Sequence, residues 1–597
     1  EEDSMTNISA SASEFGAKRL PDGAVRFRLW APAQETVWVA IDGGNLLPME
    51  RTSDGWFEAV ADVPDGTRYQ YRLSDGLMVP DPASTGQADD VHGPSIVQTD
   101  TFSWKHPDWL GKPWTEVVLY EVHAGAAGGF RGIRDDLPRL KELGITAIEL
   151  MPVNDFPGKR NWGYDGVLPY APDSAYGTRD DLKELVDTAH GLGLMMFLDV
   201  VYNHFGPDGN FLNSYAPQFF RDDVKTPWGP AIDFRRREVR SFFTSNVLMW
   251  LTEFRFDGLR FDAVHAIQEQ DWIEEMAATV RATIARGRPT VAKDRPMVAQ
   301  DRPMVAKDRY VHLVLEHHNA ASHLRKAVDA QWNDDGHNVL HVLLTDESGG
   351  YYADYAADPA TKLARVLAEG WVYQGEHSAY LEGPRGEPSA DLPPYAHVLF
   401  LQNHDQIGNR AFGERLTSLT SAAALEAAIA LQLLCPQIPL IFMGEETASQ
   451  TPFLFFTDHH DELADAVREG RRQEFAGFAE FADPQKRERI PDPNAAETFA
   501  ASVPRSGSSE RFVFYQRLLA LRMTEIVPRL AGTKSLGATA IGPKAVFARW
   551  RLGDGSTLAI VTNLGSDTVK FQAPAGRLLF ATGDAGPMTA AYLEVAE

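Results

Sequence analysis

The sequence contains a single cysteine, Cys435, among 597 residues. One cysteine cannot form an internal disulfide, so a disulfide-stabilised scaffold is excluded and a reducing compartment is favoured. No run of 18 apolar residues occurs, which argues against a membrane-spanning helix. Positive charge is scarce, since 57 Lys and Arg stand against 83 Asp and Glu, for a net charge of −26. Such a surface repels phosphate backbones and anionic lipids, so we expect no nucleic-acid partner and no membrane partner.

The first residues also lack the features of a secretion signal. Residues 1–14 are small, polar and acidic, without the basic and apolar parts of a signal peptide. They predict a disordered N-terminus, and together with the single cysteine they predict a cytoplasmic protein. The chain is too long for one hydrophobic core, so we expect two to four domains.

Short β-strands are predicted near both ends of the chain. In residues 15–98, apolar and polar side chains alternate in four stretches separated by turn signals, at 25–29, 37–41, 56–60 and 69–73. This pattern predicts an N-terminal β-sandwich. After residue 528 the pattern returns, and strands at 545–550 and 556–564 flank the hairpin signal Gly553-Asp554-Gly555. Residues 529–597 are therefore predicted to form a C-terminal β-sandwich domain.

Between these regions, in residues 110–528, apolar strands alternate with amphipathic helices. One helix ends at Gly144, another begins at Thr178 with Asp181 completing a capping box, and the last covers 510–524. Strand–helix alternation predicts a parallel sheet. We count eight strand candidates, at 117–123, 145–153, 195–201, 256–264, 311–317, 330–334, 396–403 and 439–444. Eight strands close a (β/α)8 barrel, so the predicted fold class is α/β, a TIM barrel between two β-domains.

Three long segments are predicted to lie outside the regular elements. Segments 202–235 and 349–395 follow strands, where such barrels place their substrate-binding loops. A repeat of seven residues occurs three times in succession in 288–308, and every copy contains a proline. Because proline interrupts a helix, the repeat predicts an extended surface loop rather than a coiled coil.

Four of the predicted strands end in or lead directly to an acidic residue. Asp199, Asp262, Glu316 and Asp405 each follow an apolar stretch. Any one of them alone is best read as an ordinary loop carboxylate. Four at one end of a barrel would converge on the catalytic end, and clustered carboxylates repel one another, so core packing does not explain them.

Two carboxyl groups, one ionised and one protonated, form the machinery of retaining glycoside hydrolysis. Arg260 stands two residues before Asp262 and shares its strand face, so we expect it to keep Asp262 ionised as the nucleophile. Glu316 has no basic neighbour on its strand face except His318, and we expect a raised pKa and a general acid role.

Aromatic and histidine residues beside these acids suggest a sugar-binding site. Tyr164, in the Trp162–Gly166 segment, offers a ring for stacking on a pyranose, and His204 and His404 could bind hydroxyl groups. For each histidine alone, an ordinary loop position is an equal alternative. No pair of histidines has a metal-ligand spacing, so we predict no metal and no other cofactor.

These residues resemble the motifs of the α-amylase superfamily of retaining glycosidases. The segments 199–204, 258–265, the Glu316 strand and 402–405 stand in the order that this superfamily uses. The resemblance implies Asp262 as nucleophile, Glu316 as general acid/base and Asp405 as transition-state stabiliser. It also implies a set of substrate-binding residues: Tyr164, Asp199, His204, Arg260, His265, Trp332 and His404.

Longer stretches, among them 149–177, 401–416 and 452–475, resemble the branch of this superfamily that releases trehalose from modified maltooligosaccharides. The resemblance implies α-glucan oligosaccharides ending in trehalose as substrates, no required metal, and a functional pairing with the synthase that makes such ends. Discrimination is then expected on the leaving-group side, from 203–212, His265 and 332–337, with a core position for Trp332 as an equal alternative. A glucan branching enzyme is the alternative, although Gln402-Asn403 stands where branching enzymes usually carry serine before His-Asp. A non-catalytic glucan-binding protein is disfavoured by the intact acids.

Overall fold

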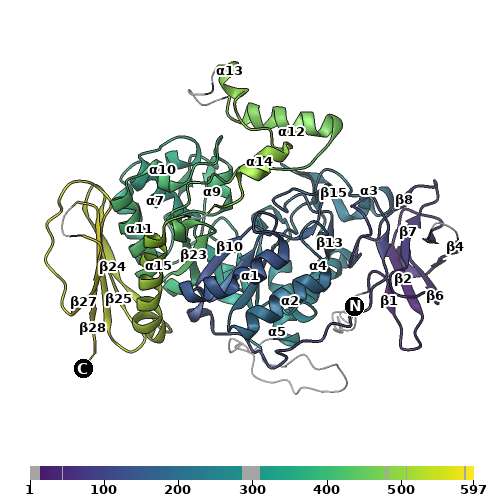
Figure 1. Cartoon of the computed structure of the whole chain (residues 1–597), viewed down its shortest axis with the longest axis horizontal. Coiled ribbons are helices and arrows are strands. Elements are labelled where there is room, and N and C mark those ends of the chain that lie inside the picture. The colour runs from purple at the N-terminus through teal and green to yellow at the C-terminus, as the bar shows by residue number, and fades with distance from the viewer. Residues whose placement is uncertain are drawn as a thin grey trace.

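The computed structural model describes residues 14–42, 45–284, 309–476, 481, 483–505, 507–583 and 586–596. The predictions for residues 1–13 and for the repeat at 288–308 lie outside these residues. Figure 1 shows a central barrel with the N-terminal strands on one side and the C-terminal sheet on the other. No helix in the described part of the chain is both long and apolar enough to cross a membrane.

The N-terminal region consists of two antiparallel sheets. One contains β1 (Lys18–Arg19), β2 (Val25–Trp30), β6 (Trp56–Ala61) and β5 (Glu50–Arg51). The other contains β4 (Asn45–Pro48), β3 (Trp38–Ile41), β7 (Arg68–Arg72) and β8 (Met78–Val79), with β9 (Ser95–Ile96) beside β7. Phe27 of the first sheet packs edge-on against Tyr69 of the second, with ring centroids 4.9 Å apart. The predicted β-sandwich is confirmed, and its alternating apolar residues form the interior between the sheets.

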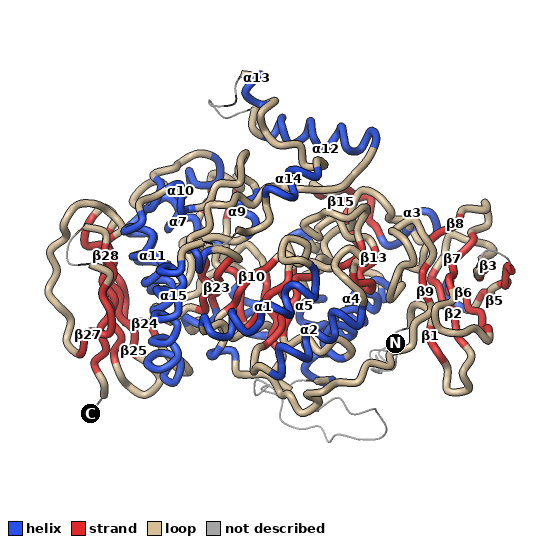
Figure 2. The backbone as a smooth tube through the Cα atoms, viewed as in Figure 1, coloured by secondary structure: helices blue, strands red, loops and turns tan. Residues whose placement is uncertain are grey.

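The centre of the molecule is a closed barrel of eight parallel strands, as the sequence predicts. In order these are β10 (Leu119–Val122), β11 (Ala147–Leu150), β14 (Met195–Val200), β17 (Gly258–Phe261), β18 (His312–Leu315), β19 (Ala330–Trp332), β22 (His397–Phe400) and β23 (Ile438–Phe442). Seven strands fall within their predicted stretches, including the short one at 330–334, and β23 begins one residue before the stretch predicted at 439–444. Figure 2 shows these strands at the centre with helices around them.

Two predicted helix ends carry the caps that the sequence indicates. α1 (Gly129–Leu143) ends at Gly144, whose φ of 105° is readily adopted only by glycine. α2 (Arg179–Gly191) begins with a complete capping box between Thr178 and Asp181. The other long helices are α4 (Arg237–Thr252), α5 (Asp271–Thr283), α7 (Asp334–Thr345), α8 (Pro359–Glu369), α11 (Ala422–Leu434), α12 (Asp461–Glu474) and α15 (Ser509–Leu521). Short helices are α3 (Leu212–Tyr215), α6 (Ala321–Lys326), α9 (His404–Gly408), α10 (Leu416–Leu419), α13 (Pro484–Arg487) and α14 (Ala496–Ala501).

Small hairpins lie in the long segments that connect the barrel strands and the helices. β12 (Asn154–Asp155) pairs with β13 (Leu168–Pro172) after β11, and β15 (Phe220–Thr226) pairs with β16 (Gly229–Ile232) after β14. The segment after α8 contains β20 (His377–Ser378) and β21 (Gly383–Pro384). These segments include the two predicted to be substrate-binding loops.

The C-terminal region is a five-stranded antiparallel sheet. Its strands are β24 (Lys534–Gly542), β25 (Ala545–Arg551), β26 (Thr557–Asn563), β28 (Met588–Glu594) and β27 (Arg577–Ala581). The hairpin predicted at Gly553–Gly555 joins β25 to β26. The sheet packs on the barrel helices, since Trp550 Nε1 donates to the Leu367 carbonyl at 3.1 Å and Thr589 Oγ1 to the Ala427 carbonyl at 2.7 Å. The predicted β-domain is present, and its described strands lie in this one sheet.

Candidate active site

The four acidic residues predicted to converge lie at the carboxyl ends of four strands of the barrel, three of them adjacent. Asp199 is in β14, Asp262 follows β17 and Glu316 follows β18. Phe261 and Leu315 are paired in the sheet, so Asp262 and Glu316 leave the barrel at the same level. Asp405 lies in the first turn of α9, which follows β22. Barrel closure therefore brings these acids to one end of the barrel.

Arg260 connects three of these acids. Its Nη1 donates to Asp199 Oδ2 at 2.7 Å and to Asp262 Oδ1 at 2.8 Å, and its Nη2 donates to Glu316 Oε2 at 2.7 Å. The guanidinium is completely buried. One cation therefore faces three carboxyl groups, and they cannot all carry a full charge without mutual repulsion.

The exposure of the side chains separates three accessible acids from one buried acid. The side chains of Asp262, Glu316 and Asp405 are 12%, 19% and 37% exposed, whereas that of Asp199 is only 2% exposed. The first three can be reached by a molecule at the end of the barrel. Asp199 is positioned beneath them and acts through Arg260 and Tyr164.

The charge distribution within the reactive pair differs from the sequence prediction. Burial and the nearby charge of Glu316 raise the pKa of Asp262 well above its usual range. Burial also raises the pKa of Glu316, but Arg260, His265 and the Ala263 N–H outweigh it and lower that pKa to about 2. The predictions that Arg260 keeps Asp262 ionised and that the pKa of Glu316 is raised are both wrong for the free protein. The reason is that Arg260 Nη2 contacts Glu316 and the Ala263 N–H donates to the same Glu316 oxygen at 2.8 Å. The two carboxyls hydrogen-bond each other and titrate as a pair.

A buried acid that the sequence analysis did not identify binds His404 and raises its pKa. Glu121 in β10 accepts hydrogen bonds from the backbone N–H and from the Nδ1 of His404. Burial lowers the pKa of His404, but Glu121 and Asp405 outweigh this and raise it to about 9. His404 Nε2 lies 3.4 Å from Asp405 Oδ1. A charged imidazole therefore stands beside Asp405 at neutral pH, although burial still raises the pKa of that carboxyl above its usual value.

Tyr164 and His204 lie beside this group, as predicted. The Tyr164 hydroxyl donates to Asp199 Oδ2 at 2.5 Å, and its ring stacks on that of His404 with centroids 5.0 Å apart. His204 Nε2 contacts the Tyr164 carbonyl at 2.9 Å. The ring of His204 stacks on Trp228 at 4.6 Å, and Trp228 is 47% exposed. Trp228 adds an open aromatic face that the sequence analysis missed.

Trp332 and His265 occupy different environments from each other. Trp332 is 1% exposed and its ring lies 4.0 Å from the Arg260 Cζ, so it supports the guanidinium from below. The substrate contact predicted for Trp332 requires a surface that this ring does not expose. His265 is half-buried beside Glu316, and its ring stacks on His318 with centroids 3.8 Å apart.

No cluster of three or more His, Cys, Asp or Glu side chains with the arrangement of a metal site occurs among the residues that the structure describes. The polar groups at the end of the barrel instead bind one another through the contacts above. The chemistry that these protein groups can perform is proton transfer and nucleophilic attack by carboxyls.

Comparison with known proteins agrees with this arrangement. The alpha amylase catalytic domain matches residues 97–228, carbohydrate-binding module 48 (the isoamylase N-terminal domain) matches 14–85, and a domain of unknown function, DUF3459, matches 533–593. A crystal structure from Salmonella typhimurium, named as a candidate alpha amylase, superimposes with a TM-score of 0.89 and 41% identity, covering 98% of this chain and all of that one.

Curated relatives define the family more narrowly. A malto-oligosyltrehalose trehalohydrolase from Deinococcus radiodurans is 39% identical over 576 residues, which cover 93% of this chain and 90% of the relative. A 1,4-alpha-glucan branching enzyme from Photobacterium profundum is 32% identical, but over only 46% of this chain and 44% of that enzyme. The full-length match, together with the barrel and its flanking β-domains, shows that the chain belongs to the malto-oligosyltrehalose trehalohydrolase family of the alpha-amylase enzymes.

Proposed function

We propose that this protein hydrolyses the α-1,4 bond that joins a maltooligosaccharide to a terminal trehalose, and that it releases trehalose. The observation that carries the proposal is the similarity to trehalohydrolases over 93% of this chain, combined with three accessible acids, two of which bind one buried arginine. The expected reaction is a retaining double displacement.

In the first displacement, the Asp262 carboxylate attacks the anomeric carbon while Glu316 gives its proton to the glycosidic oxygen, and trehalose leaves. In the second, Glu316 removes a proton from water, which attacks the glycosyl–Asp262 bond and frees the maltooligosaccharide. Asp405 stabilises the positive charge that develops on the sugar, and its contact with His404 supports this role.

The first step requires the proton of the carboxyl pair on Glu316 and the charge on Asp262. The contacts of the free enzyme favour the reverse, because Arg260 and the Ala263 N–H both bind Glu316. The hydrogen bond between Asp262 and Glu316 provides a direct route for this proton when a sugar enters. The pair thus holds one proton in either state, and the substrate decides its position.

A competition assay tests the proposal. The enzyme is given maltooligosyltrehalose and a maltooligosaccharide of equal length, and trehalose and glucose are measured. We expect trehalose as the small product and a preference of at least about a hundredfold in kcat/KM, because a site shaped for trehalose leaves polar groups unpaired when maltose occupies it. Equal rates on both substrates would instead indicate a general α-glucan hydrolase without a preference for trehalose ends.

The branching-enzyme alternative has its own readout. Incubation with linear amylose would produce new α-1,6 branches if the protein were a transferase, and none if it is a hydrolase. A pairing with a maltooligosyltrehalose synthase and a cytoplasmic location belong to the same proposal. A coupled assay with such a synthase and linear glucan should yield trehalose only when both proteins are present.

A further inference from the structure

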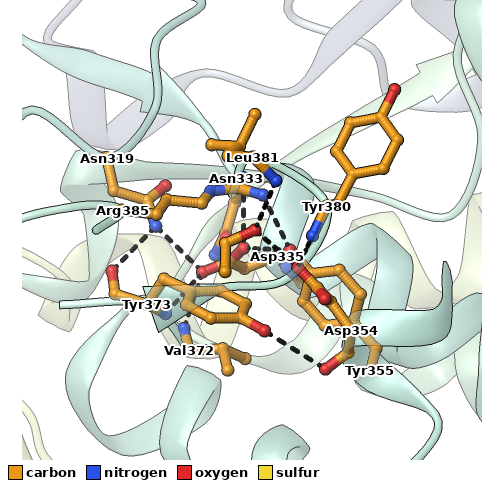
Figure 3. A network of polar contacts seen from close by, with 12 residues as sticks. Asn319, Asn333, Asp335, Asp354, Tyr355, Val372, Tyr373, Tyr380, Leu381 and Arg385 are labelled. Carbon is orange, nitrogen blue, oxygen red and sulfur yellow. Dashed lines mark hydrogen bonds and ion pairs between the residues drawn. The ribbon is translucent and has the colours of Figure 1, made fainter. Parts of the chain in front are cut away.

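A second buried charge, Asp335, organises the region beside Glu316. Asp335 is in the first turn of α7 and is fully buried. Its Oδ2 accepts hydrogen bonds from Asn319 Nδ2 at 2.9 Å and from the backbone N–H groups of Val372 and Tyr373 at 2.8 and 2.9 Å. Its Oδ1 accepts from the Tyr355 hydroxyl and pairs with Arg385 Nη2 at 3.2 Å. Figure 3 shows these donors converging on one carboxylate, which we call the Asp335 network.

The Asp335 network fastens the segment 371–387 to the loop that follows the proposed general acid. Asn319 stands three residues after Glu316, and its Nδ2 also donates to the Tyr373 carbonyl at 2.9 Å. Gly386 closes the contact: its φ is +82°, and a Cβ there would meet the Tyr373 carbonyl oxygen at 2.1 Å and Asn319 Cβ at 3.0 Å. The segment 371–387 therefore has a defined position relative to Glu316.

A further carboxylate holds the outer part of this segment. Asp354 Oδ2 accepts from the Ser378 hydroxyl at 2.6 Å and from the Tyr380 N–H at 3.4 Å. Tyr380 points away from the Asp335 network in Figure 3, is 59% exposed, and meets Tyr351 edge-on with centroids 6.2 Å apart. The anchored segment thus presents an open side chain on its outer surface.

Asp334, the neighbour of Asp335, is left without a partner by this arrangement. It is half-buried, and its carboxyl takes part in none of the hydrogen bonds or ion pairs found among the described residues. Burial, and then the charge of Glu316, raise the pKa of Asp334 to about 8, although Arg385 opposes this. A carboxyl that is protonated at neutral pH can donate one hydrogen bond and accept others, which is the pattern that a sugar hydroxyl requires.

The position of Asp334 relates it to the leaving group. Asp334 follows β19, the strand beside the one that carries Glu316, and Glu316 is the strongest charge acting on it. The residues proposed for the sugar being cleaved, Tyr164 and His204, come from the segments after β11 and β14. A group beside the proton donor faces the oxygen that departs with the leaving sugar.

We propose that Asp334 is a specificity-determining residue that binds a hydroxyl of the leaving disaccharide, and that the Asp335 network is the positioning device that holds it beside Glu316. This inference rests on the proposed function and names a residue of that site that contributes to the distinction between trehalose and maltose. A half-buried polar group that loses its partner is the kind of loss that a well-matched site penalises most.

The test compares Asp334→Ala and Asp334→Asn with the wild type on maltooligosyltrehalose and on an equal-length maltooligosaccharide. Asp334→Ala should lower kcat/KM for the trehalose-ended substrate by about tenfold or more, and by less than about threefold for the maltooligosaccharide. Asp334→Asn should retain most of the activity, because an amide also donates and accepts. The matched control is Asp180→Ala, an exposed acid in the first turn of α2, and it should change neither substrate.

Asp335→Asn tests the positioning role. We expect a higher KM for the trehalose-ended substrate with kcat changed by less than about threefold, since Glu316 keeps its own bonds to Arg260 and Ala263. A collapse of kcat at unchanged KM would instead show that the network acts on Glu316.

The failures are distinguishable. An equal loss on both substrates in Asp334→Ala, or no loss on either, overturns the assignment of Asp334 while trehalose release by the wild type still supports the function. A wild-type enzyme that released no trehalose would overturn the function. The variants would then be measured on the α-glucan that is cleaved, where an unchanged kcat/KM in Asp334→Ala also removes Asp334 from the site.

Discussion

Arg260 and Asp335 are both fully buried charged residues near Glu316, but they differ in the number and kind of groups that they contact. Arg260 is one cation among the carboxyls of Asp199, Asp262 and Glu316, so these groups compete for it and protons must be shared. Asp335 is one anion that receives hydrogen-bond donors on both oxygens. The first arrangement makes several acids share one cation and their protons, whereas the second fixes several chain segments in place. Chemistry and support are thereby separated between two neighbouring sites.

The largest effect should come from removing one acid of the pair on Arg260. Asp262→Asn and Glu316→Gln should each lower kcat by roughly four orders of magnitude or more, because no neighbour can replace a nucleophile or a proton donor. Turnover is measured as trehalose released, and folding by thermal unfolding. Asp180→Asn, the same chemical change at an exposed helix start, serves as control and should be neutral. Near-wild-type turnover in either variant would refute the assignment.

The same mechanism fixes the stereochemistry of the product. Two displacements retain configuration, so the maltooligosaccharide should first appear as the α-anomer in early-time NMR. The β-anomer would indicate an inverting enzyme with a different pair of acids.

A change at Arg260 should affect both turnover and stability. Arg260→Lys keeps the charge but not the fork that reaches three carboxyls, so we expect kcat to fall about a hundredfold or more. Loss of paired contacts in a buried group should also lower the free energy of unfolding by about 3 kcal/mol. Urea unfolding and steady-state kinetics measure the two effects. Asp335→Asn should lower the free energy of unfolding by a similar amount but should change kcat much less than Arg260→Lys does. An equal loss of kcat in both variants would show that the two sites do not have separate roles.

The Glu121–His404 pair gives a pH-dependent contribution to stability. The pKa of His404 is about 9 in the folded protein and 6.5 in the unfolded chain. A raised pKa stabilises the fold fully below pH 6.5, and the contribution, roughly 3 kcal/mol, is lost as the pH rises through 9. The free energy of unfolding should therefore fall between pH 6.5 and pH 10. Glu121→Gln should be less stable at pH 6.5 and should show a smaller decline, whereas parallel curves for both proteins would contradict the pair.

The smallest effect is expected from a substitution of Trp332, whose ring packs against the Arg260 guanidinium. Trp332→Phe keeps an aromatic ring under the guanidinium, and no hydrogen bond is lost because Trp332 Nε1 has no partner within the described residues. We expect a loss of about 1–2 kcal/mol in unfolding free energy from the smaller ring, and kcat within about threefold of wild type. A large rise in KM in Trp332→Phe would show that Trp332 contacts the substrate after all.

Much of the fold was predictable because each element carries its own local signal. The barrel strands are buried on both faces and are therefore uninterrupted apolar stretches, and the helices carry caps such as Thr178 and Gly144. Asp262 and Glu316 could be found because each marks an abrupt change from apolar to charged at a strand end. Strand position also placed Arg260 beside Asp262.

The environment of those residues could not be predicted from the sequence. Glu121 is separated from His404 by 283 residues and sits inside an apolar strand, so nothing local indicates the pair. Trp332 was expected to meet substrate, but its strand turns the ring under Arg260. The protonation of Glu316 was misjudged because Arg260 was assigned to its sequence neighbour alone, whereas its second nitrogen reaches the next strand.

The sequence by itself determined the strand and helix order, the two flanking β-domains and the acids at the strand ends, because these depend on hydrophobic period, caps and chain position. Only the tertiary structure decided which charges meet. Barrel closure brings Asp199, Arg260 and Glu316 from three strands into contact, and chain folding collects Asn319, Tyr355 and Arg385 around Asp335. Electrostatic interactions and burial depend on distance in space, so the protonation of these groups is a property of the assembled barrel.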